Sequence, residues 1–429
     1  MEKRSSNRRL KKKPTSRVDI TIVICVMLLA LVSIVTIFST TYLQYDSGSY
    51  SQTIMQIAWF AVGAVAAAVV MQLDRETLYH FAPVAYGLGL VLLVLVLIFY
   101  DRELAVTNGA HSWITIGPLS LQPSELMKVA YIIMMAHLVQ GYNDEGRRLG
   151  VEDMDMMERV KFDGRFLLKI TLWTIPPIAL IIAQNDLGTT LVFLMMFIGV
   201  IFVSGITWYI ILPAFLSFAV IALVLIIFVV YQRDLLYALG FQDYQFARID
   251  SWLDPFGNSA NESYQLAQSL KAIGSGGILG KGLGQFQVHV PVRESDMIFS
   301  TIGENFGFLG SSFVVLLYFI LIFQMISVAF RAHDAFYASM VSGIVMMFTF
   351  HIVENIGMSI GLLPLTGIPL PLISAGGTAL ITSMLSIGLI LSIKYNEGLD
   401  DEHLSKNPVV KTIRWVNRLI PQNLIDKLT

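Results

Sequence analysis

The chain has 429 residues, of which 55% are hydrophobic and 14% are charged, and its mean hydropathy is +0.67. Soluble globular proteins carry closer to a quarter charged residues, so this composition excludes a soluble globular protein and indicates a membrane protein. The formal net charge of -2 says little about partners, because orientation in a membrane depends on how charge is divided between loops. The single cysteine, Cys25, excludes an intramolecular disulfide.

Long apolar stretches dominate the sequence. A helix of about 18–25 apolar residues crosses roughly 30 Å of hydrocarbon, and such stretches occur about ten times. We therefore predict an all-α polytopic membrane protein with about ten transmembrane helices. The spans are expected at residues 18–42, 52–73, 79–100, 119–139, 166–184, 187–206, 208–231, 297–328, 336–362 and 370–393.

The charge of the tails predicts the orientation. Residues 1–17 carry a dense cluster of lysines and arginines, which the positive-inside rule keeps in the cytoplasm. With ten spans over residues 18–394, the tail at 395–429 is cytoplasmic too. The segment 232–296, between the seventh and eighth spans, then forms a large external loop. The apolar run after the basic tail is too long for a cleavable signal peptide, so we expect it to be retained.

The external loop has the composition of a folded segment, because aromatic residues give it apolar anchors. Its stretch ESYQLAQSLKAI predicts a short helix in the membrane interface, with Tyr264, Leu266 and Leu270 near one face. Ser263 or Asn261 is expected to cap this helix.

The glycine run GSGGILGKGLGQ follows that helix. It resembles a phosphate-binding P-loop only superficially, because Ser275 and Gly282 stand where that pattern requires glycine and Ser or Thr. Two alternatives stay open: backbone N–H groups that contact phosphate oxygens, or a plain flexible turn, which we favour.

Several polar residues fall within or beside predicted spans, where charge is costly and often marks a functional site. Glu125 and Lys128 lie three residues apart, so they form either a structural ion pair or part of a cavity behind Pro123. His351 and Glu354 lack the third ligand of a metal site, and buried hydrogen bonding is favoured for them. Asp186, in NDLGTT, is a candidate for substrate contact or for a structural role in a turn.

The stretch PVRESDMIFSTIGENFG places Arg293 and Asp296 directly before the eighth span and Glu304 inside it. An aspartate at the boundary of the membrane is partly desolvated. Desolvation raises the pKa of a carboxyl group, and we expect nearby Arg293 to oppose that shift.

The motifs QPSELMK, NDLGTT, SWLDPF, SLKAIGSGGILGKGLG, SDMIFSTIGENFGFLG and NIGMSIGLLPLTGIPLPLISAGGTALI occur in this order from the fourth span to the tenth. Together they resemble the RodA/FtsW family, the SEDS peptidoglycan glycosyltransferases. The form GLLPLTGIPLPLIS is more similar to the RodA, or elongation, branch.

The resemblance implies an enzyme that polymerises lipid II during cell-wall elongation and cell-shape maintenance. The family's catalytic aspartate corresponds to Asp296, which would take the proton of the GlcNAc 4-hydroxyl as general base. The reaction would invert the donor and give a β-1,4 product. The substrate-binding candidates are Glu125, Lys128, Asp186, Arg248, Gln268, Lys281, Arg293 and Glu304.

A charged leaving group needs stabilisation in this reaction. The lipid pyrophosphate would be stabilised by Arg248, Lys281 or Arg293, or by a divalent cation such as Mg²⁺. The identity and the site of a metal stay open, and no organic cofactor is expected.

Besides Ser295, which stands where the family commonly has threonine, three positions depart from the family pattern. Val292 replaces a glutamate after proline, Asn305 replaces a second glutamate, and Asn185 replaces a proline before Asp186. These departures concern contacts that flank Asp296 and leave Asp296 itself in place.

The resemblance also implies partners and a location. A class B penicillin-binding protein, a transpeptidase, is the expected partner, with other proteins of the elongation complex and no nucleic acid. Docking is expected along spans eight and nine, where small residues permit close helix approach. The expected location is the bacterial cytoplasmic membrane, with the active site facing outside. The alternatives are a lipid II flippase, ranked second, and a non-catalytic scaffold.

Overall fold

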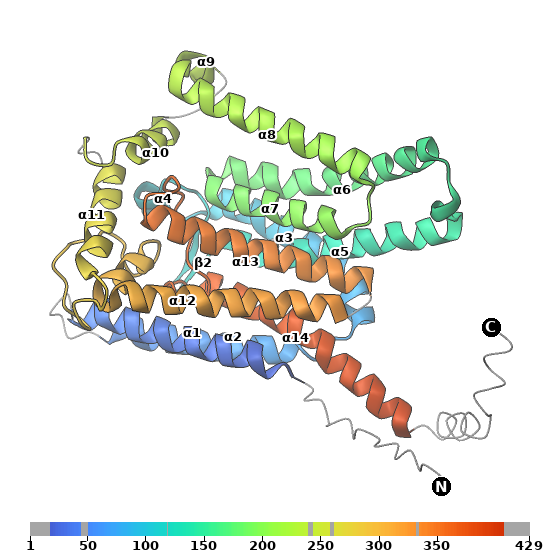
Figure 1. Ribbon diagram of the computed structural model, residues 1–429, viewed down its shortest axis with the longest axis horizontal. Coiled ribbons are helices and arrows are strands. Elements are labelled where there is room, and N and C mark those ends of the chain that lie inside the picture. The colour runs from blue at the N-terminus through green and yellow to red at the C-terminus, as the bar shows by residue number, and fades with distance from the viewer. Residues whose placement is uncertain are drawn as a thin grey trace, which may run out of the picture.

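The computed structural model describes residues 18–43, 50–117, 119–238, 243–257, 261–331 and 334–406 (Figure 1). Both predicted tails therefore lie wholly or largely outside the described residues. The elements, in chain order, are α1 Ile20–Phe38, the π-helical turn η1 Ser39–Leu43, α2 Ser51–Val70, α3 Arg75–Phe99, α4 Arg102–Asn108, β1 Ile114–Ile116, β2 Leu119–Leu121, α5 Pro123–Leu149, the 3₁₀ turn η2 Val151–Asp153, α6 Met156–Ala183, α7 Leu187–Val203, α8 Trp208–Tyr231, α9 Arg233–Ala238, α10 Asp243–Leu253, α11 Asn261–Gly276, α12 Ile298–Arg331, α13 Ala335–Ser359 and α14 Gly377–Lys406.

The structure has a helix at each of the ten predicted span positions. Among the described residues, seven of these helices are long and apolar enough to cross a membrane: α1, α2, α3, α6, α12, α13 and α14. The other three are α5, α7 and α8. The prediction of an all-α polytopic membrane fold is confirmed.

Glycines set the closest helix contacts in the bundle. Gly63 of α2 lies against Met384 of α14, and Gly388 of α14 lies against the backbone of Ala67. Gly89 of α3 meets Met127 of α5 in the same way. Association of helices in lipid depends on van der Waals packing, and small residues let the backbones approach. These pairs hold α2 on α14 and α3 on α5.

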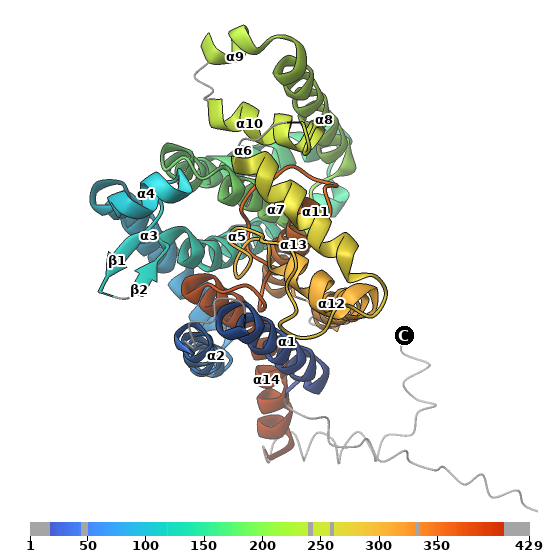
Figure 2. The ribbon, with the colours of Figure 1, turned by 90° about the vertical axis from the view of Figure 1, so that its left-hand side faces the viewer.

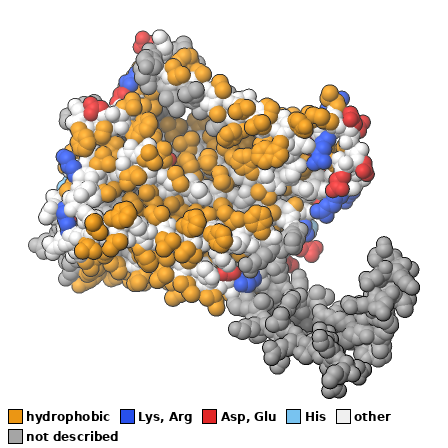
Figure 3. Space-filling view, in the orientation of Figure 1, with side chains coloured by type: hydrophobic (Ala, Val, Ile, Leu, Met, Phe, Trp, Pro, Cys, Tyr) orange, Lys and Arg blue, Asp and Glu red, His pale blue; other side chains and the backbone are white. Residues whose placement is uncertain are grey.

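The bundle has a protected interior and an apolar outer surface. Helix α13 is largely buried, whereas most residues of α2 and α3 face outward. Hydrophobic side chains cover the middle of the face in Figure 3, and charged side chains lie toward its edges. This is the distribution that a surrounding bilayer requires.

Helices α10 and α11 and the hairpin β1–β2 lie at one end of the bundle, which we call the α11 end (Figure 2). Helix α11 runs across this end rather than along the bundle (Figure 1). It packs on α12, and its Leu266 and Leu270 belong to a small hydrophobic cluster there. Two details of the prediction are wrong: Tyr264 is exposed instead of sharing their face, and Ser263 is buried inside the helix instead of capping it.

Helix α12 is interrupted at Gly307, whose φ of 63° and ψ of -159° are not helical. The glycine loop, residues 276–284, fills the interruption. The N–H groups of Phe308 and Leu309 donate to the carbonyls of Gly277 and Ile278, at 2.9 and 3.1 Å. In return, two N–H groups of the loop donate to the carbonyls of residues 304 and 305. The loop therefore supplies the hydrogen bonds that the broken helix lacks.

Two predicted boundaries are corrected. The fourth span begins at Pro123, because residues 119–121 pair with residues 114–116 as an antiparallel hairpin. The tenth span begins at Gly377 and not at 370, because Leu372 has a φ of 63° and residues 370–376 form turns.

We predict that Gly276→Ala destabilises the protein by ~1–3 kcal/mol, because an added methyl group would overlap the carbonyl oxygen of Gly303. Gly274→Ala, two residues earlier in α11, is the matched control, since nothing lies within 4 Å of its added carbon. Thermal unfolding of both purified variants in detergent measures the difference. Equal melting temperatures would show that the close contact between α11 and α12 is absent.

Candidate functional site

Asp296 lies at the α11 end, in the turn directly before α12, and its side chain is partly buried. Gly367, in the loop between α13 and α14, packs against it: a carbon added there would lie 3.3 Å from Oδ2 of Asp296. Burial raises the pKa of Asp296 to about 7, while a hydrogen bond from Ser295 and the charge of Arg248 act in the opposite direction. The opposing cation is thus Arg248, and not Arg293 as predicted from the sequence.

Arg248 is carried by α10, which is fixed at both sides. Trp252 of α10 donates from Nε1 to the carbonyl of Gly361, at 3.1 Å. Arg233, beyond the end of α8, donates to both carboxylate oxygens of Asp250, with 2.9 Å from NH1 to Oδ2. These contacts hold the cation-bearing helix over the loop that packs on Asp296.

Glu304 lies two turns into α12 and is fully buried. Its Oε1 accepts hydrogen bonds from Nζ of Lys281 at 3.0 Å and from the backbone N–H of Gln287 at 2.9 Å. Its Oε2 accepts one from Arg293 at 3.0 Å, and the Arg293 guanidinium also stacks on the Phe286 ring. The Glu304 carboxylate therefore binds residues from three segments to α12: Lys281 of the glycine loop, Gln287 after that loop, and Arg293 before Asp296.

The backbone of the glycine loop is already engaged. The N–H groups of Gly280, Lys281 and Gly282 donate to the carbonyls of Gly276, Glu304 and Asn305. These hydrogen bonds favour a structural role for the loop over direct contact of these three N–H groups with phosphate.

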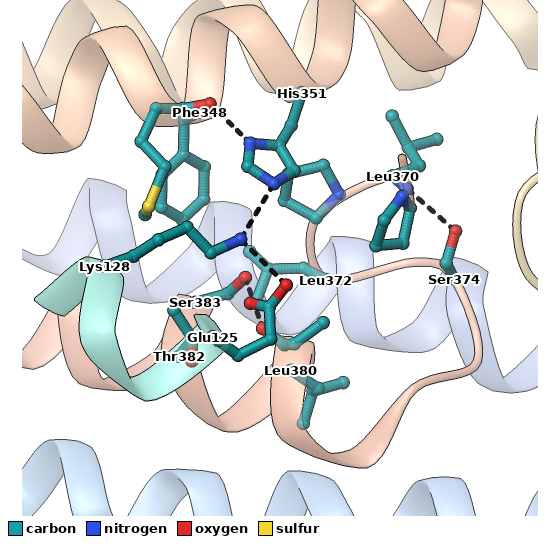
Figure 4. A pocket seen from close by; sticks show the side chains of 14 residues that line it. Glu125, Lys128, Phe348, His351, Leu370, Leu372, Ser374, Leu380, Thr382 and Ser383 are labelled. Atoms are coloured by element: carbon teal, nitrogen blue, oxygen red, sulfur yellow. Dashed lines mark hydrogen bonds and ion pairs between the residues drawn. The ribbon is translucent and has the colours of Figure 1, made fainter. Parts of the chain in front are cut away.

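Glu125 and Lys128 form a buried ion pair, with 2.8 Å between Nζ and Oε1 (Figure 4). Nζ of Lys128 also lies 3.2 Å from Nε2 of His351, whose Nδ1 lies 2.7 Å from the carbonyl of Met347. The tautomer that satisfies both contacts carries its proton on Nδ1 and accepts from Lys128 at Nε2.

A cavity of about 20 Å³ opens beside this ion pair, between α5, α13, α14 and residues 369–374. That volume holds about one water molecule. Thr382 lines the cavity, and its buried hydroxyl oxygen has no hydrogen-bond partner among the described residues. The two residues thus form a buried ion pair and also line a small, largely apolar cavity, so both alternatives that the sequence left open are present.

Asp186 caps α7 and accepts from both the N–H and the hydroxyl of Thr189 at 2.9 Å. Gln122, before α5, donates to its Oδ2 at 3.1 Å. The turn role of Asp186 is therefore present in the structure.

Two other candidates from the sequence lie elsewhere. Gln268 is partly buried on α11, and Glu354 interacts with Thr366. Substrate contact by Asp186 and Gln268 stays a prediction.

The three departures from the family pattern are structurally distinctive. Val292 has a φ of 51° and Asn185 a φ of 60°, a region that a β-branched residue such as valine rarely adopts. Asn305 is buried and donates from Nδ2 to the hydroxyl of Ser39 at 2.6 Å. Val292 therefore places backbone strain four residues before Asp296, a kind of strain that concentrates at functional sites.

Comparison with known proteins assigns the family. The family profile that covers FtsW, RodA and SpoVE, described as "cell cycle protein", matches residues 18–398. The chain belongs to the FtsW/RodA/SpoVE family. The family predicted from the motifs is thereby confirmed.

Individual members of this family resemble the chain over most of its length. The peptidoglycan glycosyltransferase MrdB of Escherichia coli K12 is 32% identical over 380 residues, covering 87% of this chain and 93% of that protein. The peptidoglycan glycosyltransferase RodA of Treponema pallidum is 29% identical, covering 87% of this chain and 97% of that protein.

Solved structures give the same result. A chain from a study of polymerization and crosslinking by a peptidoglycan synthase complex has a TM-score of 0.70 at 25% identity, covering 88% of this chain and 98% of that chain. The rod shape determining protein RodA of Thermus thermophilus has a TM-score of 0.59 at 26% identity, covering 88% and 97% of the two chains.

The candidate residues fall into three groups in this family member. Asp296 is influenced by the charge of Arg248, Glu304 binds Lys281 and Arg293, and Glu125 binds Lys128 beside the cavity. Sequence reasoning missed Gly367, Asn355 and Ser374, which pack on or hydrogen-bond to the Asp296 segment. They lie inside the quoted family motif, but only the folded chain shows that they meet residue 296.

We predict that Glu304→Gln destabilises the protein by ~3–5 kcal/mol, because it leaves a buried arginine without its carboxylate. Lys281→Met is the matched comparison and should cost less, because Lys281 is 13% exposed and Arg293 still pairs with Glu304. Thermal unfolding of both variants measures this order. A Glu304→Gln variant as stable as the parent would show that the cluster does not hold α12.

Proposed function

We propose that the chain is a peptidoglycan glycosyltransferase that polymerises lipid II, with Asp296 as its general base. The observation that supports this most strongly is the environment of Asp296: a partly buried carboxyl with a pKa of about 7, opposite Arg248. A base whose pKa lies near the working pH combines the ionised state with good proton affinity. The names carried by the relatives, peptidoglycan glycosyltransferase MrdB and RodA, support the same activity.

The reaction needs one proton acceptor and one stabilised leaving group. The 4-hydroxyl of the lipid II GlcNAc attacks the anomeric carbon of the MurNAc that ends the growing strand, and Asp296 accepts the hydroxyl proton. The new C–O bond forms while the bond to the lipid pyrophosphate breaks, and the pyrophosphate leaves with the electron pair. A single attack from the opposite face inverts the α-linked donor to a β-1,4 product.

Arg248 is the first candidate to stabilise the pyrophosphate, because its charge is near enough to lower the pKa of Asp296. Lys281 and Arg293 already bind Glu304, so their main contribution is to hold the segment that carries Asp296. Among the described residues no group of three or more His, Cys, Asp or Glu side chains could hold a metal ion. A divalent cation such as Mg²⁺ stays a candidate beside Arg248, because Mg²⁺ commonly binds through one or two carboxylates together with the phosphates of the substrate.

The proposed setting is the bacterial cytoplasmic membrane, with both termini in the cytoplasm and the α11 end outside. The basic residues of the 1–17 tail support this orientation. At the outer face, the polyprenyl chains of both substrates stay in lipid while the sugars reach Asp296. The similarity to the rod shape determining protein RodA of Thermus thermophilus supports the proposed role in cell elongation and cell shape.

A class B penicillin-binding protein is the proposed partner, with other elongation proteins. The similarity to a chain from a peptidoglycan synthase complex supports this. Docking along the eighth and ninth spans stays a prediction, but Gly303 and Gly307 of the eighth span pack on α11 and the glycine loop and are not free for a partner helix. Residues 310–312 are partly exposed and stay candidates.

A lipid II flippase is the second candidate. The observation that favours it is the buried Glu125–Lys128 pair beside a small cavity, since intramembrane charge often lines a transport path. In such a protein, variants at the ion pair would abolish activity while Asp296 variants would not.

We predict that Asp296→Asn lowers glycan-strand formation by at least ~10²-fold, the usual contribution of a general base, without loss of expression or partner binding. Polymer made from lipid II by purified, partner-bound protein is the measurement. Asp101→Asn is the control, because it makes the same change at an exposed carboxylate of the α11 end and should leave activity intact. Near-parental polymer from Asp296→Asn would remove the base assignment, and no polymer from the parent would favour the flippase.

The pH dependence of the rate gives an independent test. A base must be ionised, so kcat/KM should fall tenfold per pH unit below about 7, the pKa to which burial raises Asp296. An ordinary aspartate would lose activity only near pH 4, roughly three units lower. Initial rates of polymerisation across this range decide between them, and a rate that stays constant down to pH ~5 would contradict the raised pKa.

A further inference from the structure

The backbone that carries Asp296 is fixed by donors from distant parts of the chain. The carbonyl of Glu294 accepts from the N–H of Ala375 at 2.9 Å, and the carbonyl of Ser295 accepts from the hydroxyl of Ser374 at 2.7 Å. The carbonyl of Asp296 itself accepts from Nδ2 of Asn355 at 2.7 Å. Three consecutive carbonyls are thus each bound by a donor from elsewhere.

Asn355 joins this segment to the loop that touches the carboxylate. Its Nδ2 donates a second hydrogen bond, at 2.8 Å, to the carbonyl of Ile368. Ile368 follows Gly367, the residue that packs against Oδ2 of Asp296. One amide group on α13 therefore holds both the main chain of the aspartate and the wall against its side chain.

The cost of this arrangement is visible at Asn355. Its side chain is completely buried, and Oδ1 has no hydrogen-bond partner among the described residues. An unpaired buried polar atom costs roughly 1–3 kcal/mol, so packing alone would favour an apolar residue here. The two hydrogen bonds that Asn355 donates, to the carbonyls of Asp296 and Ile368, are a reason for an asparagine at this buried position in spite of that cost.

We propose that Asn355 is a positioning residue for the glycosyltransfer reaction: by binding the carbonyls of Asp296 and Ile368 together, it sets the orientation and the burial of the Asp296 carboxylate. Ser374 supports it from the other side of the loop, since its hydroxyl donates to Ser295 and accepts from the N–H of Leu370 at 2.8 Å. This inference rests on the proposed function only for its kinetic readout.

The charged groups around Asp296 make the effect measurable. Arg248 on α10 and Glu294 on the same segment face it. On α13, Glu354 interacts with Thr366, and His351 lies against Lys128. The loop 360–376 contains no titratable side chain. A change in the pKa of Asp296 after mutation of Asn355 would therefore report a change in its burial, in its hydrogen bond from Ser295 or in its distance from the charges of Arg248 and Glu294.

The kinetic test compares Asn355→Ala with a matched control. Asn305→Ala is that control, because Asn305 is equally buried, also donates from Nδ2, and also has an unpaired Oδ1, but it binds Ser39 instead of the Asp296 segment. For Asn355→Ala we expect kcat to fall ~10-fold or more, KM to change little, and the acid limb of the rate profile to move down by about one pH unit. For Asn305→Ala we expect a lower melting temperature and an unchanged acid limb.

A second test uses folding alone. The pKa of Asp296 is raised on folding, so its contribution to stability is present below about pH 4 and is lost as the pH rises through about 7. Asp296→Asn should therefore gain melting temperature relative to the parent between pH about 5 and about 8. In the Asn355→Ala background a fall of about one unit in the pKa of Asp296 should reduce this gain by about a third at pH about 8, and in the Asn305→Ala background the gain should be unchanged.

The outcomes separate the two claims. If both asparagine variants lose stability but neither moves the acid limb or the Asp296→Asn gain, Asn355 is structural only and the proposal is overturned. An equal shift in both variants would overturn it as well. If the parent makes no polymer, the proposed function fails, and the stability cycle still decides whether Asn355 sets the environment of Asp296.

Discussion

The interruption of α12 at Gly307 is the constraint on which the rest of the α11 end depends. A helix that breaks in a membrane leaves backbone groups without partners, and unpaired groups cost several kcal/mol each in hydrocarbon. The glycine loop supplies the missing partners. Its N–H groups donate to the carbonyls of Glu304 and Asn305, and its own carbonyls accept from the N–H groups that follow Gly307. Glycine is required there because the backbones touch. Lipid-facing α12 is thereby tied to the segment that precedes Asp296.

Two carboxylates of one short stretch consequently have different environments. Glu304 is enclosed by Lys281, Arg293 and backbone N–H groups, so it is an anion satisfied on every side. Asp296 is partly buried, with Arg248 as the cation that acts on it. The first environment suits a structural anchor, and the second suits a group that exchanges a proton. Environment, rather than residue type, separates the two roles.

The sequence predicted the spans well, because apolar length is a local property that each helix displays by itself. The candidate residues were selected by a local property too: Asp296, Glu304 and Glu125 stand out as charges beside or within apolar runs, and their roles stay predictions. The partners of these charges were harder to predict. Arg293 precedes Asp296 by three residues, yet it turns to Glu304, whereas Arg248, nearly fifty residues away, acts on Asp296. Such pairings depend on how α10, α11 and the loop before α14 fold together, and no local pattern encodes that.

The tautomer of His351 has a consequence for the interior of the bundle. Because Nδ1 is committed to the carbonyl of Met347, Nε2 offers a lone pair to Lys128, and the ring is neutral. Glutamate, lysine and imidazole then sum to zero charge beside the cavity. Because Glu125, Lys128 and His351 together carry no net charge, they do not attract a pyrophosphate over a long distance. They also provide no unpaired positive charge that could neutralise a pyrophosphate inside the bilayer. The ion pair itself lies within α5, and the contact of Lys128 with His351 links it to α13. Separating the two helices would remove this imidazole partner and expose the charged pair to hydrocarbon, so the contact stabilises their packing.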